Sequence, residues 1–502
     1  MMNISTLLEM AADAFPERTA LVAGDSRLSY RQLREASLAA AECFKQADTR
    51  YVALLDVNSL AAPVALFGAA AANLPYVPLN YRLTDPELDG LMQRVASAVV
   101  IVGEDQRARL SLPDGISAID RAAFLASAAQ PISAALEDTS DDDSVAVQLF
   151  TSGTTGKPKA AILRHDNLLS YILGTVEFGS ADETEASLVT VPPYHIAGIS
   201  ALLSSVYAGR RIVLLENFDP MAWLTACEAE RVTNAFLVPT MLSRIVDTVE
   251  RGESQRDLNA LRAIAFGGGK MPASVVIRAM ALFPKADFTN AYGLTETSST
   301  ICLLDPEDHR SALASDDPAI RKRLGSVGRP LDTVELQIRD DAGNPLPIDM
   351  SGQVFVRGGQ VAGEYLDAGS ALDADGWFYT RDRGYLDAGN YLFLEGRADD
   401  VIVRGGENIS PGEIEDILIE HPAVCDAAVV AVPDEQWGEA VGAAIVLNEH
   451  AQVSVAELQG WVRDRLRSSR VPTRIEFRTE LPYNELGKVL RRIIRKELES
   501  RT

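Results

Sequence analysis

The amino-acid sequence predicts a layered α/β protein with two domains. Its 502 residues are more than one ordinary hydrophobic core contains, so two or more domains are expected. Up to about residue 395, strand-like runs alternate with amphipathic helical stretches, which is typical of a layered α/β architecture. Three of these runs span 211–215, 234–238 and 263–266. After Gly396 the pattern becomes that of a compact α+β unit, and we expect domains at 1–396 and 397–502.

The end of the large domain and the small domain carry their own local signals. Strand-like pairs at 334–338 and 353–357 precede a hairpin that we expect to turn at 387–390. In the small domain, Ser410-Pro411-Gly412-Glu413 has the pattern of a capping box with proline at the first helical position. Ser454 to Glu457 is a second helix start of the same kind. Strand-like runs lie between the two predicted helices, at 427–432 and 441–447.

Composition and charge indicate a soluble globular protein that does not bind nucleic acid. The chain is 47% hydrophobic and 24% charged, and its formal net charge is -24, which would repel a phosphate backbone. From Trp461 onward the balance reverses, with 12 Lys or Arg against 6 Asp or Glu. This basic tail is either a solvated helix face or a site for an anionic cosubstrate.

The cysteines and the apolar segments indicate a cytoplasmic location. Four cysteines and five histidines are scattered without metal-type spacing, as expected of a reduced protein without structural zinc. The N-terminus carries Glu9 and lacks the long apolar core of a signal peptide. Residues 59–81 are uncharged, but alanine and proline within them favour a buried helix followed by a turn over a transmembrane segment.

Residues 150–159, Phe-Thr-Ser-Gly-Thr-Thr-Gly-Lys-Pro-Lys, form a loop suited to phosphate. Gly153 and Gly156 allow backbone N–H groups to turn inward, and the hydroxyl groups and two lysines add donors and charge. We expect a strand at 145–150 before this loop and a helix at 166–178 after it. The spacing departs from the Walker pattern, because proline follows Lys157. A flexible polar surface loop is the alternative.

Residues 151–159 resemble the phosphate loop of the adenylate-forming superfamily, which contains acyl-CoA synthetases, peptide-synthetase adenylation domains and luciferases. Further stretches resemble motifs of that superfamily in its order, at 290–297, 379–382, 396–400 and 486–492. The resemblance implies a large N-terminal layered α/β domain with a distorted β-barrel subdomain. It also implies a small mobile α+β domain at the C-terminus.

The resemblance assigns roles to individual residues. The Tyr292 ring would pack on adenine, Glu296 would bind Mg²⁺, and Asp382 would accept the ribose hydroxyl groups. Arg397 would face phosphate, and Asp399 would be the pivot of a hinge. The residues expected to act in catalysis are Lys488, Glu296, Thr151 and His195. Those expected to bind nucleotide or thiol are Ser152, Gly153, Thr154, Thr155, Gly156, Lys157, Gly268, Gly269, Asn290, Ala291, Tyr292, Gly293, Thr295, Asp382, Arg397, Asp399, Gly405, Gly406 and Trp437.

Two residues depart from the motifs that surround them. Lys270 follows the glycine run at a position where relatives more often have a small or acidic residue, and its role is open. Arg381 stands where most relatives have glycine, and it either tightens phosphate contact or is a solvated arginine.

The implied reaction has two steps. A carboxylate attacks the α-phosphate of ATP to give an acyl-adenylate and pyrophosphate, with Lys488 and Mg²⁺ offsetting the repulsion between the anions. The small domain then rotates, and Gly405 and Gly406 leave room for pantetheine, so that CoA forms the thioester and AMP is released. Trp437 either lines this channel or is a buried core residue. Arg470 retains a cation for the CoA phosphates, but the aromatic group expected before it is missing, so carrier-protein pantetheine is an alternative acceptor.

The acid substrate is expected to lack an amino group. Residues 191–198 match the acyl-pocket motif, and His195 stands at its aromatic gate, unless it is an ordinary core histidine. Residues 187–200 contain no acidic side chain to pair with a substrate ammonium, so an uncharged acyl or aryl acid is favoured. The pocket wall is expected to include Val238, Pro239 and Thr240.

The sequence thus predicts a cytoplasmic, ATP-dependent carboxylate–CoA ligase of fatty-acid or secondary metabolism, monomeric or homodimeric. Two alternatives stay open: an acyl-AMP ligase that loads an acyl carrier protein, and a non-catalytic nucleotide-binding regulatory protein.

Overall fold

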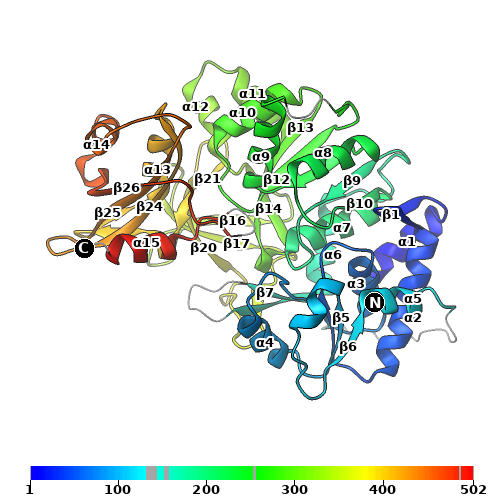
Figure 1. Ribbon diagram of the computed structural model, residues 1–502. Coiled ribbons are helices and arrows are strands. Elements are labelled where there is room, and N and C mark those ends of the chain that lie inside the picture. The colour runs from blue at the N-terminus through cyan, green and yellow to red at the C-terminus, as the bar shows by residue number, and fades with distance from the viewer. Residues whose placement is uncertain (1, 132–143, 152–157, 253–255, 485–487, 501–502) are drawn as a thin grey trace.

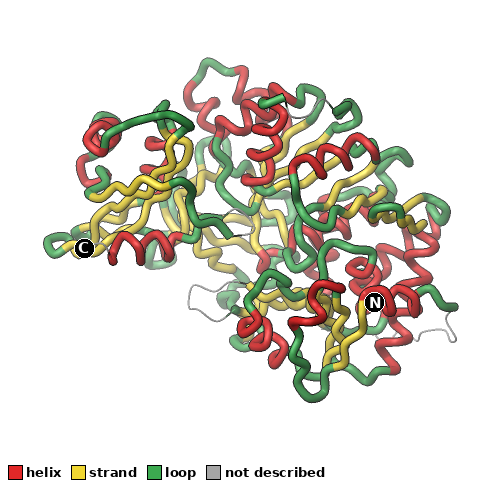
Figure 2. Tube along the Cα trace, in the orientation of Figure 1, coloured by secondary structure: helices red, strands yellow, loops and turns green. Residues whose placement is uncertain are grey.

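The computed structural model describes residues 2–131, 144–151, 158–252, 256–484 and 488–500. Its strands form four sheets, three in the first 397 residues and one in the C-terminal part, which protrudes from the rest of the molecule (Figure 1). Helices cover the sheets, as the red and yellow segments of Figure 2 show. The predicted fold class, a mixed α/β protein with a large N-terminal and a small C-terminal domain, is confirmed.

The first sheet has nine strands, and its central six are parallel. Their order is β15-β14-β13-β12-β11-β9-β10-β1-β2, with antiparallel pairs only at the two edges. The strands are β1 (Thr19–Ala23), β2 (Ser26–Ser29), β9 (Ala186–Val189), β10 (Arg211–Leu214), β11 (Asn234–Leu237), β12 (Ala263–Gly267), β13 (Asp287–Leu294), β14 (Ser299–Leu304) and β15 (Arg329–Pro330). The predicted runs at 211–215, 234–238 and 263–266 correspond to β10, β11 and β12.

The second sheet has eight strands in the order β19-β18-β8-β7-β4-β3-β5-β6. They are β3 (Tyr51–Leu55), β4 (Tyr76–Pro78), β5 (Ala98–Val102), β6 (Ser117–Asp120), β7 (Val145–Thr151), β8 (Lys159–Arg164), β18 (Glu364–Tyr365) and β19 (Gly369–Ser370). Strand β8 corrects the prediction that the loop after β7 leads into a helix. The run Lys-Ala-Ala-Ile-Leu-Arg pairs antiparallel with β7, because its central residues are apolar and buried in the sheet. The helix after it, α6, spans His165–Thr175 rather than 166–178.

One hydrophobic core lies between these two sheets, and two others cover their outer faces. The central core joins residues of both sheets with the helices α1 (Ser5–Ala14), α2 (Tyr30–Gln46), α3 (Ala61–Ala71), α5 (Arg121–Ala128), α6 and α7 (Ile196–Ala208). Helices α8 (Pro220–Ala229), α9 (Pro239–Glu250) and α10 (Ala273–Leu282) cover the first sheet, and α4 (Asp85–Arg94) covers the second. The prediction of a buried helix in 59–81 is confirmed by α3, in which every residue but Ala71 is buried. None of the helices that the structure describes has both the length and the apolar composition that a bilayer span requires.

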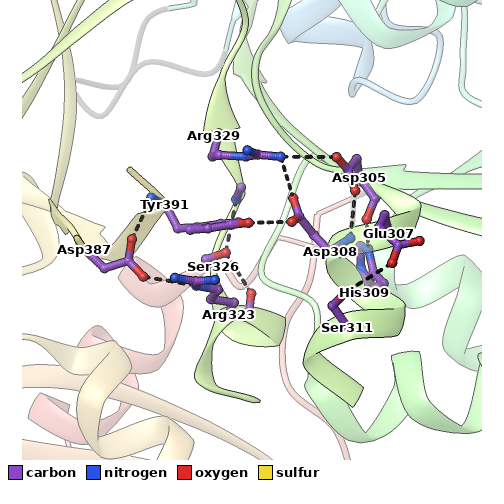
Figure 3. Close-up of polar contacts among 11 residues, drawn as sticks. Asp305, Glu307, Asp308, His309, Ser311, Arg323, Ser326, Arg329, Asp387 and Tyr391 are labelled. Atoms are coloured by element: carbon purple, nitrogen blue, oxygen red, sulfur yellow. Dashed lines mark hydrogen bonds and ion pairs between the residues drawn. The ribbon is translucent and has the colours of Figure 1, made fainter. Parts of the chain in front are cut away.

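The third sheet, formed by the end of the large domain, is a four-stranded antiparallel sheet. Its order is β16-β17-β20-β21, formed by β16 (Glu335–Arg339), β17 (Gly352–Arg357), β20 (Phe378–Leu386) and β21 (Leu392–Arg397). The predicted hairpin turn is confirmed, since Asn390 donates its N–H to the Asp387 carbonyl oxygen at 2.9 Å. The turn is held by the network in Figure 3, in which Tyr391 donates to Asp308 of the helix after β14 and Arg323 lies 3.3 Å from Asp387. The remaining short segments here are α11 (Pro306–Ala314), α12 (Pro318–Arg321) and the 3-10 turns at 295–297, 322–325 and 398–400. A further 3-10 turn, at 104–109, lies between β5 and β6.

The fourth sheet belongs to the C-terminal part. It contains β22 (Ile402–Arg404), β23 (Glu407–Ile409), β24 (Val424–Asp434), β25 (Gly438–Leu447) and β26 (Arg474–Arg478), and small cores lie on its two faces. Its helices are α13 (Pro411–Ile419), α14 (Val455–Arg463) and α15 (Arg491–Ser500), with a 3-10 turn at 468–470. Ser454 caps α14 as predicted, by accepting from the Glu457 N–H. The capping box predicted at Ser410 is wrong, because the Ser410 hydroxyl donates to the Glu395 carbonyl oxygen instead.

Gly267 is the clearest test of the parallel sheet. A Cβ atom there would lie 2.1 Å from the Ala291 carbonyl oxygen of β13. We therefore expect Gly267→Ala to lower the free energy of unfolding by about 2–3 kcal/mol, seen as a lower urea midpoint. The control is Gly90→Ala in α4, where a Cβ meets nothing within 4 Å and a gain of up to about 1 kcal/mol is expected. An equal midpoint for the two variants would contradict this packing.

Candidate active site

The candidate site lies at the carboxyl ends of four neighbouring parallel strands. Strands β9, β11, β12 and β13 are adjacent in the sheet, and Gly267 at the end of β12 pairs with Ala291 in β13. Crevices at this edge of an open parallel sheet are where such folds bind ligands. The chain continues from these ends into the predicted acyl-pocket motif, into Val238, into Gly268 and Gly269, and into the motif that contains Glu296. Gly268 has φ +82°, a conformation that L side chains rarely adopt.

Tyr292, Asp382 and Arg397, predicted to contact adenine, ribose and phosphate, form one cluster. The Tyr292 hydroxyl donates to Asp382 Oδ2 at 2.5 Å, and Arg397 Nη1 lies 3.3 Å from Asp382 Oδ1. Asp382 is only 7% exposed, and burial raises the pKa of its carboxyl although Arg397 and Tyr292 oppose the rise. The carboxylate therefore has both oxygens held by groups from two different sheets.

A β-bulge aims Asp382 at this cluster. The register of β17 and β20 shifts between the pairs Phe355–Tyr379 and Gln353–Arg383, so β20 has extra residues there. Thr380 fixes the bulge, since its hydroxyl donates to the Val354 carbonyl oxygen at 2.9 Å and accepts from the Asp382 N–H at 3.1 Å. Arg381 takes the left-handed conformation, with φ +64°, and its side chain lies 3.7 Å from Asp399. The structure thus pairs Arg381 with the predicted pivot, a contact that was not one of the two roles considered for it.

The base of the predicted phosphate loop is described, although residues 152–157 lie outside the described residues. That excluded range contains the predicted phosphate-binding residues Ser152, Gly153, Thr154, Thr155, Gly156 and Lys157. Thr151 pairs with Lys159 across β7 and β8, and its hydroxyl donates to the Lys159 carbonyl oxygen at 3.4 Å. The Lys159 ammonium lies 5.2 Å from the centre of the Tyr365 ring.

Glu296, the predicted metal ligand, is held by Tyr365. The Tyr365 hydroxyl donates to Glu296 Oε1 at 2.6 Å, and the Glu296 carbonyl oxygen accepts from the N–H groups of Ala362 and Gly363. Burial and the neighbouring Glu296 carboxylate raise the pKa of Tyr365, so it stays a hydrogen-bond donor. No cluster of three His, Cys, Asp or Glu side chains that could hold a metal occurs in the described part of the chain. A cation here would therefore complete its shell with phosphate oxygens and waters, as Mg²⁺ commonly does.

Lys488 lies within electrostatic reach of the same cluster. Two hydrogen bonds join Lys488 to Asn484: Lys488 donates its N–H to the Asn484 side chain, and Asn484 donates its N–H to the Lys488 carbonyl oxygen, both at 2.8 Å. The Lys488 side chain is exposed, but the pKa of its ammonium is lowered. The larger cause is desolvation by the surrounding protein, and the second is the positive charge of Arg397. Lys488 also stabilises the charged form of Asp382. The structure thus brings together Lys488, Arg397 and Asp382, which are far apart in the sequence.

His195 lies at the start of α7, beside the carboxyl end of β9. The centre of its ring lies 4.4 Å from the centre of the Tyr194 ring. The Tyr194 ring in turn packs edge-on against the Tyr81 ring, with 5.4 Å between the ring centres. Burial, with a smaller effect of Arg82, lowers the pKa of His195 to about 3, so the imidazole is neutral at physiological pH. Asn58 fixes the adjacent backbone by donating to the Val191 and Leu215 carbonyl oxygens. His195 is therefore a neutral aromatic surface in an aromatic cluster.

The predicted thiol channel has an exposed tryptophan. Trp437 is 45% exposed, so the alternative of a buried core residue is wrong. Its indole lies against Gly405, where an added Cβ atom would come within 2.7 Å of the ring. Arg470, considered as a cation for the CoA phosphates, is bonded instead to Glu407 and Glu413.

Two residues of the site were missed by the sequence interpretation. Tyr365 positions Glu296, and Arg94 of α4 donates to the Pro158 carbonyl oxygen at 2.6 Å and stacks on the Phe150 ring at 4.9 Å. Arg94 thus contacts both ends of the predicted phosphate loop. Neither residue lies in a recognisable motif, and only the pairing of β18 with β8 and the packing of α4 bring them there.

Comparison with known proteins places this geometry in a family. The sequence profile described as "AMP-binding enzyme" matches residues 8–366, and that described as "AMP-binding enzyme C-terminal domain" matches 413–488. The chain is 32% identical to a feruloyl-CoA synthase of Amycolatopsis sp, over 96% of each chain. It is 31% identical to an indoleacetate–CoA ligase of Aromatoleum aromaticum, over 100% of this chain and 99% of that one. Its fold matches the amide bond synthetase McbA of Marinactinospora thermotolerans with a TM-score of 0.86 and 28% identity, over 99% and 100% of the two chains.

Two substitutions at Arg381 separate backbone strain from the ion pair. Arg381→Ala removes the ion pair with Asp399 but keeps a Cβ atom in the left-handed conformation. Arg381→Gly removes both the ion pair and the strained Cβ atom. Since a Cβ atom costs roughly 1 kcal/mol in this conformation, we expect the Gly variant to exceed the Ala variant in unfolding free energy by about that amount in urea titrations. An Ala variant as stable as the Gly variant would mean that position 381 is not strained.

Proposed function

The chain belongs to the AMP-binding enzyme family, in the acyl-CoA synthetase branch of the adenylate-forming superfamily, and on this premise we propose that it activates an aromatic monocarboxylic acid. It is an AMP-forming acid–CoA ligase, which first makes an acyl-adenylate and then a CoA thioester. The observation that carries the site assignment is the cluster of Asp382, Arg397 and Lys488, where three motifs meet at one buried carboxylate.

In the proposed first step, a substrate carboxylate oxygen attacks the α-phosphorus of ATP. The new P–O bond forms as the bond from the α-phosphorus to the bridging oxygen breaks, and pyrophosphate leaves. Asp382 would accept the ribose hydroxyl groups in place of the Tyr292 hydroxyl that it now holds. Lys488 and Arg397 would supply positive charge where the two anions meet, which lowers the barrier by electrostatic stabilisation.

The residues present fit a magnesium ion with a single protein carboxylate. Glu296 would hold Mg²⁺, and Tyr365 would keep that carboxylate in place through its 2.6 Å hydrogen bond. When bound, the ion would neutralise phosphate charge and assist departure of pyrophosphate. Thr151 and Lys159, tied together at the base of the loop, would hold the end of the phosphate chain.

The character of the predicted acyl pocket supports an aromatic acid with one carboxylate. His195 is half-buried and packs against the buried ring of Tyr194, which contacts Tyr81, so its imidazole supplies a supported ring surface on which an aromatic substrate can stack. His195 is neutral because of its lowered pKa, so it would not attract a second carboxylate. The relatives named for feruloyl and indoleacetate substrates also act on aromatic acids.

The second proposed step belongs to the C-terminal part. We propose that the chain divides into domains at residues 1–396 and 397–502, and that the part after the pivot Asp399 rotates to bring Gly405, Gly406 and Trp437 to the acyl-adenylate. The thiol sulfur would then attack the acyl carbon, the carbon–oxygen bond to AMP would break, and the thiol proton would pass to solvent. Because Arg470 is neutralised by Glu407 and Glu413, other cations of the basic tail would have to meet the CoA phosphates. The four free cysteines fit a reducing compartment such as the cytoplasm.

A panel of acids tests the proposed substrate class. We expect pyrophosphate release to be fastest with ferulate and indoleacetate, slower with octanoate, and slowest with malonate and phenylalanine. CoA, a pantetheinylated carrier protein and an amine are then compared as acceptors, and CoA should react fastest. If ATP binds with ordinary affinity but no acid releases pyrophosphate, a nucleotide-binding regulatory role replaces the ligase.

Substitution of Lys488 tests the two-step scheme. Lys488→Ala should lower the rate of adenylation by about 100-fold or more, since it removes a charge used in the transition state. Thioester formation from supplied acyl-adenylate should keep most of its rate. Lys285→Ala, at a lysine of the large domain that contacts Asn259, is the control and should change neither half-reaction. Equal losses in both half-reactions for Lys488→Ala would contradict the scheme.

A further inference from the structure

Lys270 connects the glycine run of the large domain to the first turns of α13. Its ammonium lies 2.5 Å from Asp416 Oδ1 and donates to the Gly412 carbonyl oxygen at 3.3 Å. Lys270 stands directly after Gly267–Gly269, at the edge of the sheet where the candidate site lies. One side chain therefore joins that edge to the C-terminal part.

The N-terminal end of α13 also contacts the large domain directly. The Ser410 hydroxyl donates to the Glu395 carbonyl oxygen in β21. A Cβ atom at Gly412 would lie 2.9 Å from the same carbonyl oxygen and 3.5 Å from the Lys270 ammonium. This close approach exists only in one relative orientation of the two parts.

Helix α13 is in turn connected to Lys488. Glu415, next to Asp416, is buried and forms a two-pronged ion pair with Arg491, of which the Nη2–Oε2 contact is 2.9 Å. Arg491 also donates to the Val429 carbonyl oxygen at 2.6 Å, and it lies three residues after Lys488. Burial would raise the pKa of Glu415, but Arg491, assisted by Lys270, lowers it below its usual value. The position of α13 is thereby transmitted through a buried charge pair to the segment that carries Lys488.

We propose that Lys270 is a positioning residue for adenylation, holding the C-terminal part in the orientation that presents Lys488 to Asp382 and Arg397. Its effect on the reaction depends on the function proposed above, but its effect on orientation does not. The ion pair is half-exposed on both sides, with 51% and 57% of the side chains accessible. Exposed pairs contribute little, so the expected change in the orientation equilibrium is about two- to fivefold rather than complete.

The orientation can be measured without any substrate. Cys43 in α2 and Cys425 in β24 are exposed, one in each part of the molecule, whereas Cys227 and Cys302 are buried. Nitroxide labels on Cys43 and Cys425 give a distance distribution by pulsed electron double resonance. Lys270→Ala should shift the ratio of populations away from the present orientation by about two- to fivefold, and Lys270→Asp should shift it further because it repels Asp416.

Two controls distinguish the loss of the ion pair between Lys270 and Asp416 from a general disturbance of the fold. Lys285→Ala removes a lysine that contacts Asn259 within the large domain, and the distances should be unchanged. The exchanged pair Lys270→Asp with Asp416→Lys should return the populations toward those of the unsubstituted protein. If neither Lys270 variant changes the distances, or if the exchange gives no recovery, the proposal is wrong.

The half-reactions give an independent measurement. Lys270→Ala should slow acid-dependent pyrophosphate exchange by about two- to fivefold, and Lys270→Arg should restore most of the rate. Thioester formation from supplied acyl-adenylate should be unchanged or faster. Equal slowing of both half-reactions would overturn the positioning role. If the enzyme activates no acid at all, the distance measurement still decides the orientation while the proposed function fails.

Discussion

The buried carboxylate of Asp382 is the interaction on which the rest of the site depends. A carboxylate that is 7% exposed is unfavourable unless its charge is compensated and its oxygens are hydrogen-bonded. Tyr292 from the first sheet and Arg397 from the third meet that need, and Lys488 from the C-terminal part adds charge. Residues of two sheets and of the C-terminal part therefore meet at the Asp382 carboxylate, whose burial is unfavourable without them.

Much of this arrangement could be predicted from the sequence, because its signals are local. The apolar residues from Val145 to Phe150 are enough to predict a strand. The residue types from Asp387 to Asn390 predict the turn. Ser454 caps its helix by accepting from a residue only three positions away. The site motifs are similarly short, so Tyr292, Asp382 and Lys488 could be chosen before their proximity was known.

The features that were missed depend on long-range pairing. The residues around Lys159 do not by themselves distinguish a strand from the start of a helix. The strand β8 forms because β7 and β18 pair with it on its two edges. Tyr365 and Arg94 gain their roles from contacts across more than 60 residues. Ser410 has the residue types of a helix cap, yet a carbonyl oxygen of another domain is the better partner for its hydroxyl. In each case tertiary contacts overrode the local preference.

Asp382 and Arg397 are directly opposite one another on a single hairpin, and the turn of that hairpin is fastened by Arg323 and by the bond from Tyr391 to Asp308. A rotation about Asp399 would leave both of these groups in place while Lys488 moves away. The nucleotide would consequently be retained through the change between half-reactions. Escape of the intermediate to water would then be governed by the stability of this hairpin rather than by the motion of the C-terminal part.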